Sequence, residues 1–322
     1  MILWSDTSKE GEQIKVGGQA VIEGVMMRAP KTFTVAVRKP DGNLAVRADR
    51  WHSPMEKWPL LKKPLLRGCI VLYEALFNGI QALTYSAQEA MGEDEEPLSS
   101  WALGATIAFA MGGAIVLFVV VPHLATLAIG WLAGADLGVR SIWFHVIDGI
   151  IKVGIFIGYI VLISLMNEIR RVFQYHGAEH KSIHAYEKGE DLTVENARKH
   201  PCLHSRCGTA FLLLVLMFSI FLFTAVFPLL PKEFLGDRIL TNIFYIFVKI
   251  LLMVPIAGCS YEIIRLGNTV DNRFLNYLLL PGLWMQKLTT REPSDDQIEV
   301  ALEALRRTLE NEGLFARTES SG

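Results

Sequence analysis

Four apolar stretches constrain the fold of this chain more than any other feature of its sequence. They cover residues 103–123, 142–166, 209–228 and 239–260 of a 322-residue chain in which 51% of residues are hydrophobic. A helix that crosses the hydrocarbon core of a bilayer needs roughly 20 mainly apolar residues. The sequence therefore predicts a mainly α, polytopic membrane protein with four transmembrane helices.

Lysine and arginine residues alternate between the loops that join these stretches. The segment before the first stretch holds 12 of them, the loop between the second and third holds seven, and the segment after the fourth holds seven. The two other loops hold only Arg140, Lys232 and Arg238. Because cytoplasmic loops are enriched in lysine and arginine, we expect a multi-pass protein of the cytoplasmic (inner) membrane with both termini in the cytoplasm.

The expected spans divide the chain into three parts. Residues 1–100 form a cytoplasmic N-terminal region, and residues 101–260 form the four-span membrane domain, which includes a cytoplasmic loop, 167–208. Residues 261–322 form a cytoplasmic C-terminal part, with an interfacial or re-entrant apolar segment and then an amphipathic helix. Ser294 opens that helix, because it starts a capping box that ends at Gln297.

Three segments of the N-terminal region carry local signals. Residues 32–51 alternate branched or aromatic residues with others around a Pro-Asp-Gly-Asn turn, which predicts a β-hairpin. The glycine-rich segment 17–28 favours a packed turn at the membrane surface, with a phosphate-binding loop as the alternative. Residues 65–88 place polar residues on one helical face, which predicts an interfacial amphipathic helix, with a fifth span as the alternative.

The motif with the clearest chemistry is His176-Gly177-Ala178-Glu179-His180, which has the form H-x-x-E-H. His176 and His180 are one helical turn apart, so both can bind one metal ion. Glu179 lies beside them and can accept a proton from water. We expect this turn to continue the second span out of the membrane and to hold a divalent transition metal, with zinc as the first choice.

A second group of potential ligands follows some twenty residues later in the same loop. His204 and Cys207 are the best candidates to complete the site, while His184, His200 and Cys202 are held in reserve. A zinc site with four protein ligands is closed and structural, whereas one with three is open and catalytic. The sequence leaves both alternatives open.

Three charged residues fall inside the predicted spans. Asp148 and Lys152 are four residues apart in the second span, and Lys249 lies in the fourth at a similar depth. Ionisable residues in a bilayer are candidates for a functional polar path. A structural ion pair between the two helices is the alternative.

The remaining composition narrows the function class. The net charge of −2 says nothing about a partner, but the sequence has no basic domain and no nucleic-acid motif, so no nucleic-acid partner is expected. There is no Ser/His/Asp set, nucleotide fingerprint or redox C-x-x-C pair. The expected partners are membrane lipids, together with a second copy of the chain or another membrane protein.

Five blocks of this sequence resemble one family. They are residues 17–28, 175–181, 206–209, 258–266 and 281–293. They are similar to the YqhQ-like family of uncharacterised bacterial membrane proteins, which are described as predicted metal-dependent enzymes. Carried over by position, the resemblance implies a site in these blocks and just beside them. Its residues would be His176, Glu179, His180, His204 and Cys207. Lys181, Arg206 and Glu262 would lie nearby. Family members usually have proline at the position of Ser205, so the local turn differs.

These observations together predict a membrane-embedded, metal-dependent hydrolase with a cytoplasm-facing site. Glu179 would be the general base, and Arg206 or Lys181 would stabilise developing negative charge. The substrate would be a lipid, a lipid-linked molecule or a membrane peptide. The alternative is a non-enzymatic transporter or membrane scaffold with a structural metal site.

Overall fold

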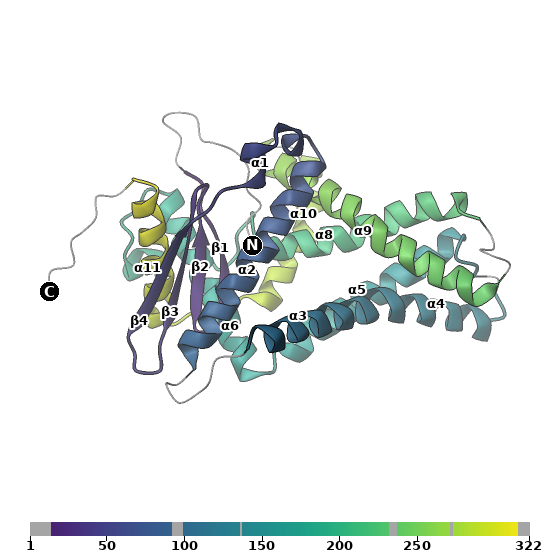
Figure 1. Ribbon diagram of the computed structural model, residues 1–322, viewed down its shortest axis with the longest axis horizontal. Helices are drawn as coiled ribbons and strands as arrows, with labels where there is room; N and C mark the ends of the chain where they lie inside the picture. Colours follow the sequence, from purple (N-terminus) through teal and green to yellow (C-terminus); the bar gives the residue numbers. More distant parts are fainter. Residues whose placement is uncertain (1–13, 92–98, 136, 232–236, 271–272, 315–322) are drawn as a thin grey trace.

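The computed structural model describes residues 14–91, 99–135, 137–231, 237–270 and 273–314. Within these ranges the chain forms one antiparallel sheet with helices on both sides, and the long apolar helices extend away from one side of the sheet region (Figure 1). In chain order the elements are β1 (Gly17–Val21), β2 (Gly24–Arg28), β3 (Thr32–Arg38), β4 (Leu44–Arg50), α1 (Pro54–Lys57), η1 (Pro59–Lys62), α2 (Leu66–Ala90), α3 (Ser100–Ile115), η2 (Val116–Val120), α4 (Val121–Leu132), α5 (Ile142–Ile163), α6 (Asn167–Glu187), α7 (Val194–Arg198), α8 (Gly208–Val226), η3 (Phe227–Leu229), α9 (Arg238–Thr269), α10 (Arg273–Thr289) and α11 (Asp295–Asn311).

The described residues include four helical segments that are long and apolar enough to cross a membrane: Trp101–Leu132, Ile142–Ile163, Gly208–Leu229 and Ile239–Gly267. These match the four predicted stretches, so the chain is a mainly α polytopic membrane protein. The first segment runs without interruption through α3, η2 and α4. Its π-helical turn η2 lies just before Pro122, which has no N–H to donate to the preceding turn.

The N-terminal sheet is a meander with the strand order β1-β2-β3-β4. The predicted hairpin is present as β3 and β4, in which Val35 pairs with Arg47. The interpretation of residues 17–28 as a packed turn was wrong, because this segment forms the hairpin of β1 and β2. The glycine there serves close packing: a Cβ atom on Gly24 would overlap the carbonyl oxygen of Ala36 on the neighbouring strand.

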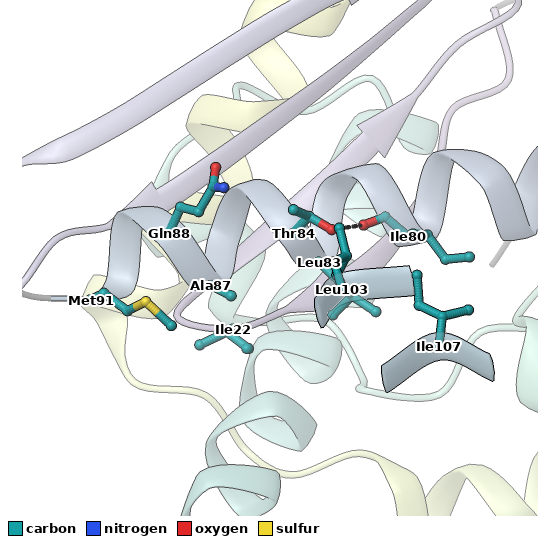
Figure 2. A pocket seen from close by; sticks show the side chains of 9 residues that line it. All are labelled: Ile22, Ile80, Leu83, Thr84, Ala87, Gln88, Met91, Leu103 and Ile107. Carbon is teal, nitrogen blue, oxygen red and sulfur yellow. Dashed lines mark hydrogen bonds between the residues drawn. The ribbon is translucent and has the colours of Figure 1, made fainter. Parts of the chain in front are cut away.

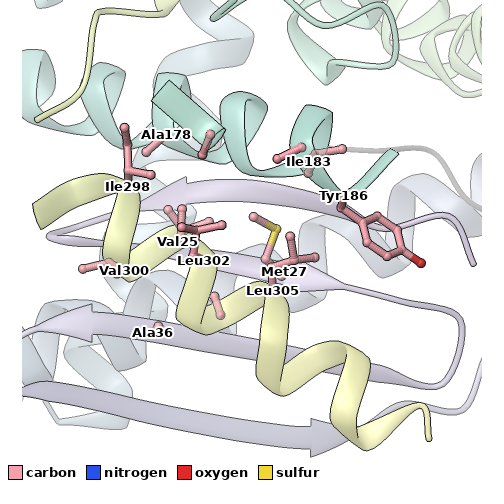
Figure 3. Packing of buried hydrophobic residues seen from close by; sticks show 14 of the residues in the cluster. Val25, Met27, Ala36, Ala178, Ile183, Tyr186, Ile298, Val300, Leu302 and Leu305 are labelled. Carbon is pink, nitrogen blue, oxygen red and sulfur yellow. The ribbon is translucent and has the colours of Figure 1, made fainter. Parts of the chain in front are cut away.

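Both faces of the sheet are covered. On one face, Val25 and Met27 of β2 pack with Ile183 of α6 and Leu305 of α11 (Figure 3). On the other face, the cluster built around Met26 includes residues of α2. Successive residues of a strand point to opposite faces, so β2 is buried along its whole length. The core thus joins all three parts that the sequence was expected to form.

The C-terminal helices α10 and α11 help to position the site. α11 starts with the predicted capping box of Ser294 and Gln297. α10 packs along α8 so closely that a Cβ atom on Gly282 would overlap Ala210. The segment expected to be interfacial or re-entrant is therefore part of the helix bundle in the described structure. It leads the chain from the spans to the sheet region, and its last turn supplies contacts to the candidate site.

The helix α2 lies against the sheet with its polar side inward. Glu74 is buried, and its carboxylate accepts hydrogen bonds from Arg28 on β2 at 2.6 Å and from Ser53 at 2.5 Å. Tyr73, Leu76 and Phe77 are exposed on the outer side. α2 is not among the four candidate spans in the described residues. Its two faces fit the predicted amphipathic helix rather than the alternative of a fifth span.

Candidate metal centre

The H-x-x-E-H motif lies on α6, which is a separate helix. The expectation that it continues the second span was wrong: α5 ends at Ile163, and α6 begins at Asn167. The connection is tight, because Leu165 and Met166 donate backbone hydrogen bonds to carbonyls three residues earlier. The turn allows α6 to leave the direction of α5 and to pack against the sheet and α11.

A glycine inside the motif permits the closest packing of this helix. The backbone N–H of Arg291 donates to the carbonyl of Phe173 at 2.9 Å, which ties the segment after α10 to α6. A Cβ atom on Gly177 would overlap the carbonyl oxygen of Arg291. Gly177 therefore lets the chain after α10 lie directly against the turn that carries the two histidines.

Three side chains offer ligand atoms to one point. The ligand atoms of His176, His180 and Cys207 all lie within 4.8 Å of one another, and all three residues are buried. The Nε2 atom of His176 is 3.2 Å from Sγ of Cys207. Ligands at about 2.0 Å and 2.3 Å from a tetrahedral zinc ion would lie about 3.5 Å apart. The donor set therefore fits a zinc ion.

Hydrogen bonds on the far side of each ring fix the histidine tautomers. Nδ1 of His176 donates to the carbonyl of Thr289 at 2.8 Å, and Nδ1 of His180 donates to the carbonyl of Cys202 at 2.5 Å. With the proton on Nδ1, Nε2 keeps a lone pair for a metal ion. The buried Nε2 of His180 has no hydrogen-bond partner among the described residues, which fits this role.

The electrostatics favour the ligating form of the cysteine. Burial alone would raise the pKa of the Cys207 thiol, but His176 and His180 hold that pKa well below its usual value. Burial would likewise lower the pKa of His176, yet the charge of Cys207 raises it to about 9. Cys207 also caps the first turn of α8, where the helix dipole stabilises a thiolate. A thiolate is the form of cysteine that binds metal.

Glu179 lies on the same turn and has an unusual environment. Its side chain is 0% exposed, and neither carboxylate oxygen has a hydrogen-bond partner within the described structure. A Cβ atom on Gly18 of β1 would lie 2.8 Å from Cγ of Glu179, so the strand leaves it no spare room. An unpaired buried carboxylate is costly. Its place on the α6 turn that carries His176 and His180 provides a physical reason for it to be kept.

His204 does not join this group in the described structure. It belongs to a second cluster, in which ligand atoms of His184, Glu187 and His204 lie within 4.8 Å of one another. Nδ1 of His204 accepts the backbone N–H of Arg206 at 3.2 Å, so Nε2 carries the proton and donates to Glu187 at 3.3 Å. In this tautomer His204 has no free lone pair for a metal ion. In the described structure these hydrogen bonds hold the second cluster together.

The two expected charge stabilisers have other contacts. Nζ of Lys181 donates to the carbonyls of Arg198 at 3.0 Å and His200 at 2.7 Å, and pairs with Glu292 at 2.8 Å. Its three N–H groups are thus engaged in holding the loop after α7. Arg206 forms an ion pair with Glu187. In the described structure both cations are engaged in these contacts, and their expected role in stabilising negative charge stays a prediction.

The reserve candidates also lie apart from the three ligand atoms. Nε2 of His184 lies 2.9 Å from the carbonyl of Leu203, and Nε2 of His200 lies 2.9 Å from a carboxylate oxygen of Glu190. Burial and the neighbouring Glu292 raise the pKa of the Cys202 thiol to about 12. Glu262, expected near the site from the family resemblance, pairs with Arg67 of α2. These residues shape the surroundings of the site.

Several residues that support the site were missed by sequence reasoning. The carbonyl of Thr289 orients His176, and the amide of Gln286 exchanges two 2.8 Å hydrogen bonds with the backbone of His204. Both lie at the end of α10, more than eighty residues from their partners along the chain. In the sequence, the signal for such a contact was a polar residue, Gln286, within an apolar segment.

The charged residues inside the spans form a separate cluster. Asp148 of α5 accepts hydrogen bonds from Lys249 of α9 at 2.7 Å and from Lys152 at 3.2 Å. All three side chains are at most 5% exposed. The ammonium group of Lys249 also lies 5.3 Å from the ring centre of Phe144. The predicted contact between the two spans is therefore present, as a triad with two cations on one carboxylate.

Comparisons with known proteins place the chain in a family. Residues 63–311 match the family described as "Protein of unknown function (DUF1385)". The chain is 36% identical over 310 residues to "Uncharacterized protein YqhQ" of Bacillus subtilis (strain 168), and the match covers 92% of this chain and 93% of that relative. No solved structure matches the chain. Neither description names a metal or a reaction, so the chemistry must be argued from the residues. The predicted resemblance is confirmed at the level of the family: this chain belongs to the DUF1385 family, together with its YqhQ relative.

Proposed function

We propose that this protein is a membrane-embedded, metal-dependent hydrolase that uses zinc. The observation that carries the proposal is the pairing of two buried features, a three-residue ligand set and a carboxylate on the same turn of α6 as two of the ligands. His176, His180 and Cys207 present ligand atoms to one point, and Glu179 lies beside them with an unpaired carboxylate. Three protein ligands with an adjacent carboxylate are typical of catalytic zinc sites, in which the fourth position stays open.

Each residue of the proposed site would have a separate role. His176, His180 and Cys207 would hold the ion, and the carbonyls of Thr289 and Cys202 keep the two rings oriented. Zinc bound there would act as a Lewis acid and lower the pKa of water to about 7. Glu179 would accept the proton from that water, since it is a carboxylate held in a site free of competing hydrogen bonds.

The substrate class follows from the position of the site. The ligand Cys207 directly precedes the membrane-spanning α8, so the centre lies near one end of a span. We propose that this end faces the cytoplasm, because lysine and arginine residues concentrate in the loops on that side. Both termini would then be cytoplasmic in the inner membrane. Molecules that present a polar end at this depth are lipids, lipid-linked molecules and membrane peptides.

A second candidate is a non-enzymatic transporter or scaffold with a structural metal site. The observation in its favour is the burial of the ligands: His176, the most accessible of the three, is 9% exposed. A zinc ion there would hold α6 against the start of α8. This candidate predicts that Glu179→Gln is silent, whereas the catalytic proposal predicts a loss of function.

The test begins with elemental analysis of the detergent-purified protein. We expect one zinc ion per chain, lost in His180→Ala and Cys207→Ala and retained in His204→Ala. His200→Ala is the matched control, because His200 is also a buried histidine of this region but is bonded to Glu190. Loss of zinc in His204→Ala would indicate a closed four-ligand site and favour the structural candidate.

The second step separates catalysis from folding. Glu179→Gln preserves the shape of the side chain and removes its proton-accepting charge. We expect this variant to keep its zinc and its thermal stability and to fail in complementing a strain that lacks the gene. A Glu179→Gln protein that binds zinc and complements fully would refute the hydrolase proposal.

A further inference from the structure

A cavity of about 310 Å³ lies between α2, the start of α3 and the turn that joins β1 to β2. Figure 2 shows the residues that line it. They are Ile22, Ile80, Leu83, Thr84, Ala87, Gln88, Met91, Leu103 and Ile107. Small-molecule sites in proteins have volumes of about 300–1,000 Å³, so this cavity is large enough to hold one slender ligand or part of a larger one.

The lining offers almost nothing to a polar ligand. Seven of the nine side chains are hydrocarbon or thioether groups. The hydroxyl of Thr84 donates to the carbonyl of Ile80 at 2.8 Å, so it is satisfied within its own helix. Figure 2 shows Gln88 on the side of α2 away from Leu103 and Ile107. A ligand would lose its hydration without gaining hydrogen bonds, so the occupant must be apolar along its length.

The location of the cavity indicates where such a ligand comes from. Leu103 and Ile107 belong to the first turns of the candidate span Trp101–Leu132, whose most apolar window is 0% buried by the protein. That window of the helix therefore faces lipid, and one wall of the cavity is continuous with this lipid-facing surface. Of the α2 residues, Leu83 lines the cavity and is itself 40% exposed. An acyl chain could pass from the bilayer into the cavity without crossing water.

We propose that this cavity binds one acyl chain of a membrane lipid. The bound acyl chain would lie between α2 and the first span, at the level where the span meets the sheet region. Because the bilayer is as apolar as the cavity, the affinity comes from van der Waals contacts between the acyl chain and the lining side chains. The binding site is distinct from the metal centre and does not depend on the proposed hydrolase activity.

The turn beside the cavity connects it physically to the candidate metal centre. Ile22 lines the cavity, and the next residue, Glu23, pairs with Arg171 and accepts a hydrogen bond from Tyr175 of α6 at 3.3 Å. Gly18 of the same β1 strand packs against Glu179. Four strand residues span about 13 Å. If the proposed function holds, a lipid bound here by one chain would have its polar end within reach of that site.

The test is photo-crosslinking in vesicles of phosphatidylethanolamine and phosphatidylglycerol. The probe is phosphatidylglycerol with a diazirine at the end of one acyl chain, and labelled peptides are read by mass spectrometry. Phe109 is the internal reference, because it is 84% exposed on the lipid-facing span. It lies about 14 Å along the helix from Ser100, near the middle of a hydrocarbon core about 30 Å thick. Free chain ends should label it.

Labelling of α2 reports the bound chain. We expect residues 80–91 to be labelled in the wild type, since a chain end reaches α2 when it enters the cavity. Ala87→Trp fills the cavity and should abolish this label while Phe109 remains labelled. Ala108→Trp is the matched control, because Ala108 is exposed on the same span and does not line the cavity. It should leave both labels unchanged.

A second variant, Ile22→Gln, keeps the test valid if Ala87→Trp does not fold. Ile22→Gln changes a 40% exposed turn residue and places an amide in the cavity wall, so it should fold and lose the α2 label. Equal α2 labelling in the wild type and both variants would overturn the proposal. So would crosslinks between two protein copies at α2, which would identify the cavity as an interface. His180→Ala should keep the α2 label, so the lipid site and the metal centre fail independently.

Discussion

Replacing Asp148 by asparagine tests whether the charged triad inside the membrane is held together by its single carboxylate. Asp148 lies 2.7 Å from Nζ of Lys249 and 3.2 Å from Nζ of Lys152, and all three side chains are buried. Asparagine has nearly the same shape and no charge. The substitution therefore leaves two ammonium groups in a buried site without a counter-charge.

The size of the effect can be worked out from these distances. At an effective dielectric constant of about 20, the two pairs attract by roughly 6 and 5 kcal/mol. The loss is smaller than this sum, because a lysine can release its proton. Releasing it at pH 7 from an ordinary pKa near 10.4 costs about 5 kcal/mol. Since breaking a buried ion pair costs about 3–5 kcal/mol, we expect Asp148→Asn to lower the free energy of unfolding by about 3–5 kcal/mol.

Lys152→Met is the matched comparison. It removes one of the two cations, leaves a neutral pair of Asp148 and Lys249, and roughly conserves volume. We expect a change below about 1.5 kcal/mol, as for other volume-conserving replacements. The assay is unfolding by SDS in mixed micelles, followed by the fluorescence of the seven tryptophans. Equal losses in the two variants would refute the reasoning. A stable Lys152→Met protein that fails to complement would instead support a functional polar path.

Two further predictions concern the metal centre. Gly177→Ala should weaken zinc binding and lower the free energy of unfolding by about 1–3 kcal/mol, because the added methyl group would overlap the carbonyl of Arg291. Gly158→Ala is the control: Gly158 has open space around it, so this variant should change neither zinc binding nor stability. In the metal-free protein, the raised pKa of His176 means that its contribution to stability is full below about 6.5 and is lost as the pH rises through about 9. The lowered pKa of Cys207 contributes stability that grows over the same range, because this thiol ionises at a lower pH in the folded protein. The two contributions oppose each other, so thermal unfolding of the metal-free wild type should change little between these pH values, and a steep decline would contradict the pairing of the two groups.

The sequence predicted those features that depend on local pattern. The spans follow from apolar length, the start of α11 from the capping box at Ser294, and the shared face of His176 and His180 from helical spacing. Strand β2 escaped prediction for a physical reason. The sheet is covered on both faces, so β2 has no exposed polar positions and shows no alternation. A short segment of a glycine, three apolar residues and an arginine can equally be a turn or a strand.

The site was predicted in part, and the missing part has a different cause. The motif places His176, Glu179 and His180, but the choice between His204 and Cys207 depends on hydrogen bonds that the local sequence does not encode. His204 is turned away by the backbone N–H of Arg206 and by Glu187. Such contacts come from backbone atoms and distant segments, and a motif carries no information about them.

The contacts around the candidate centre explain why residues scattered over the chain resemble one family. Block 17–28 supplies the strand against Glu179, block 206–209 begins beside Cys207, and block 281–293 supplies the carbonyl that orients His176. These segments meet the 175–181 block on α6 from three directions. A purely structural metal would need its ligands and their orienting groups, but not a buried carboxylate without a partner. The segments converge on the α6 turn that carries His176, Glu179 and His180, and the proposed hydrolase gives the unpaired Glu179 carboxylate a role that a structural metal does not.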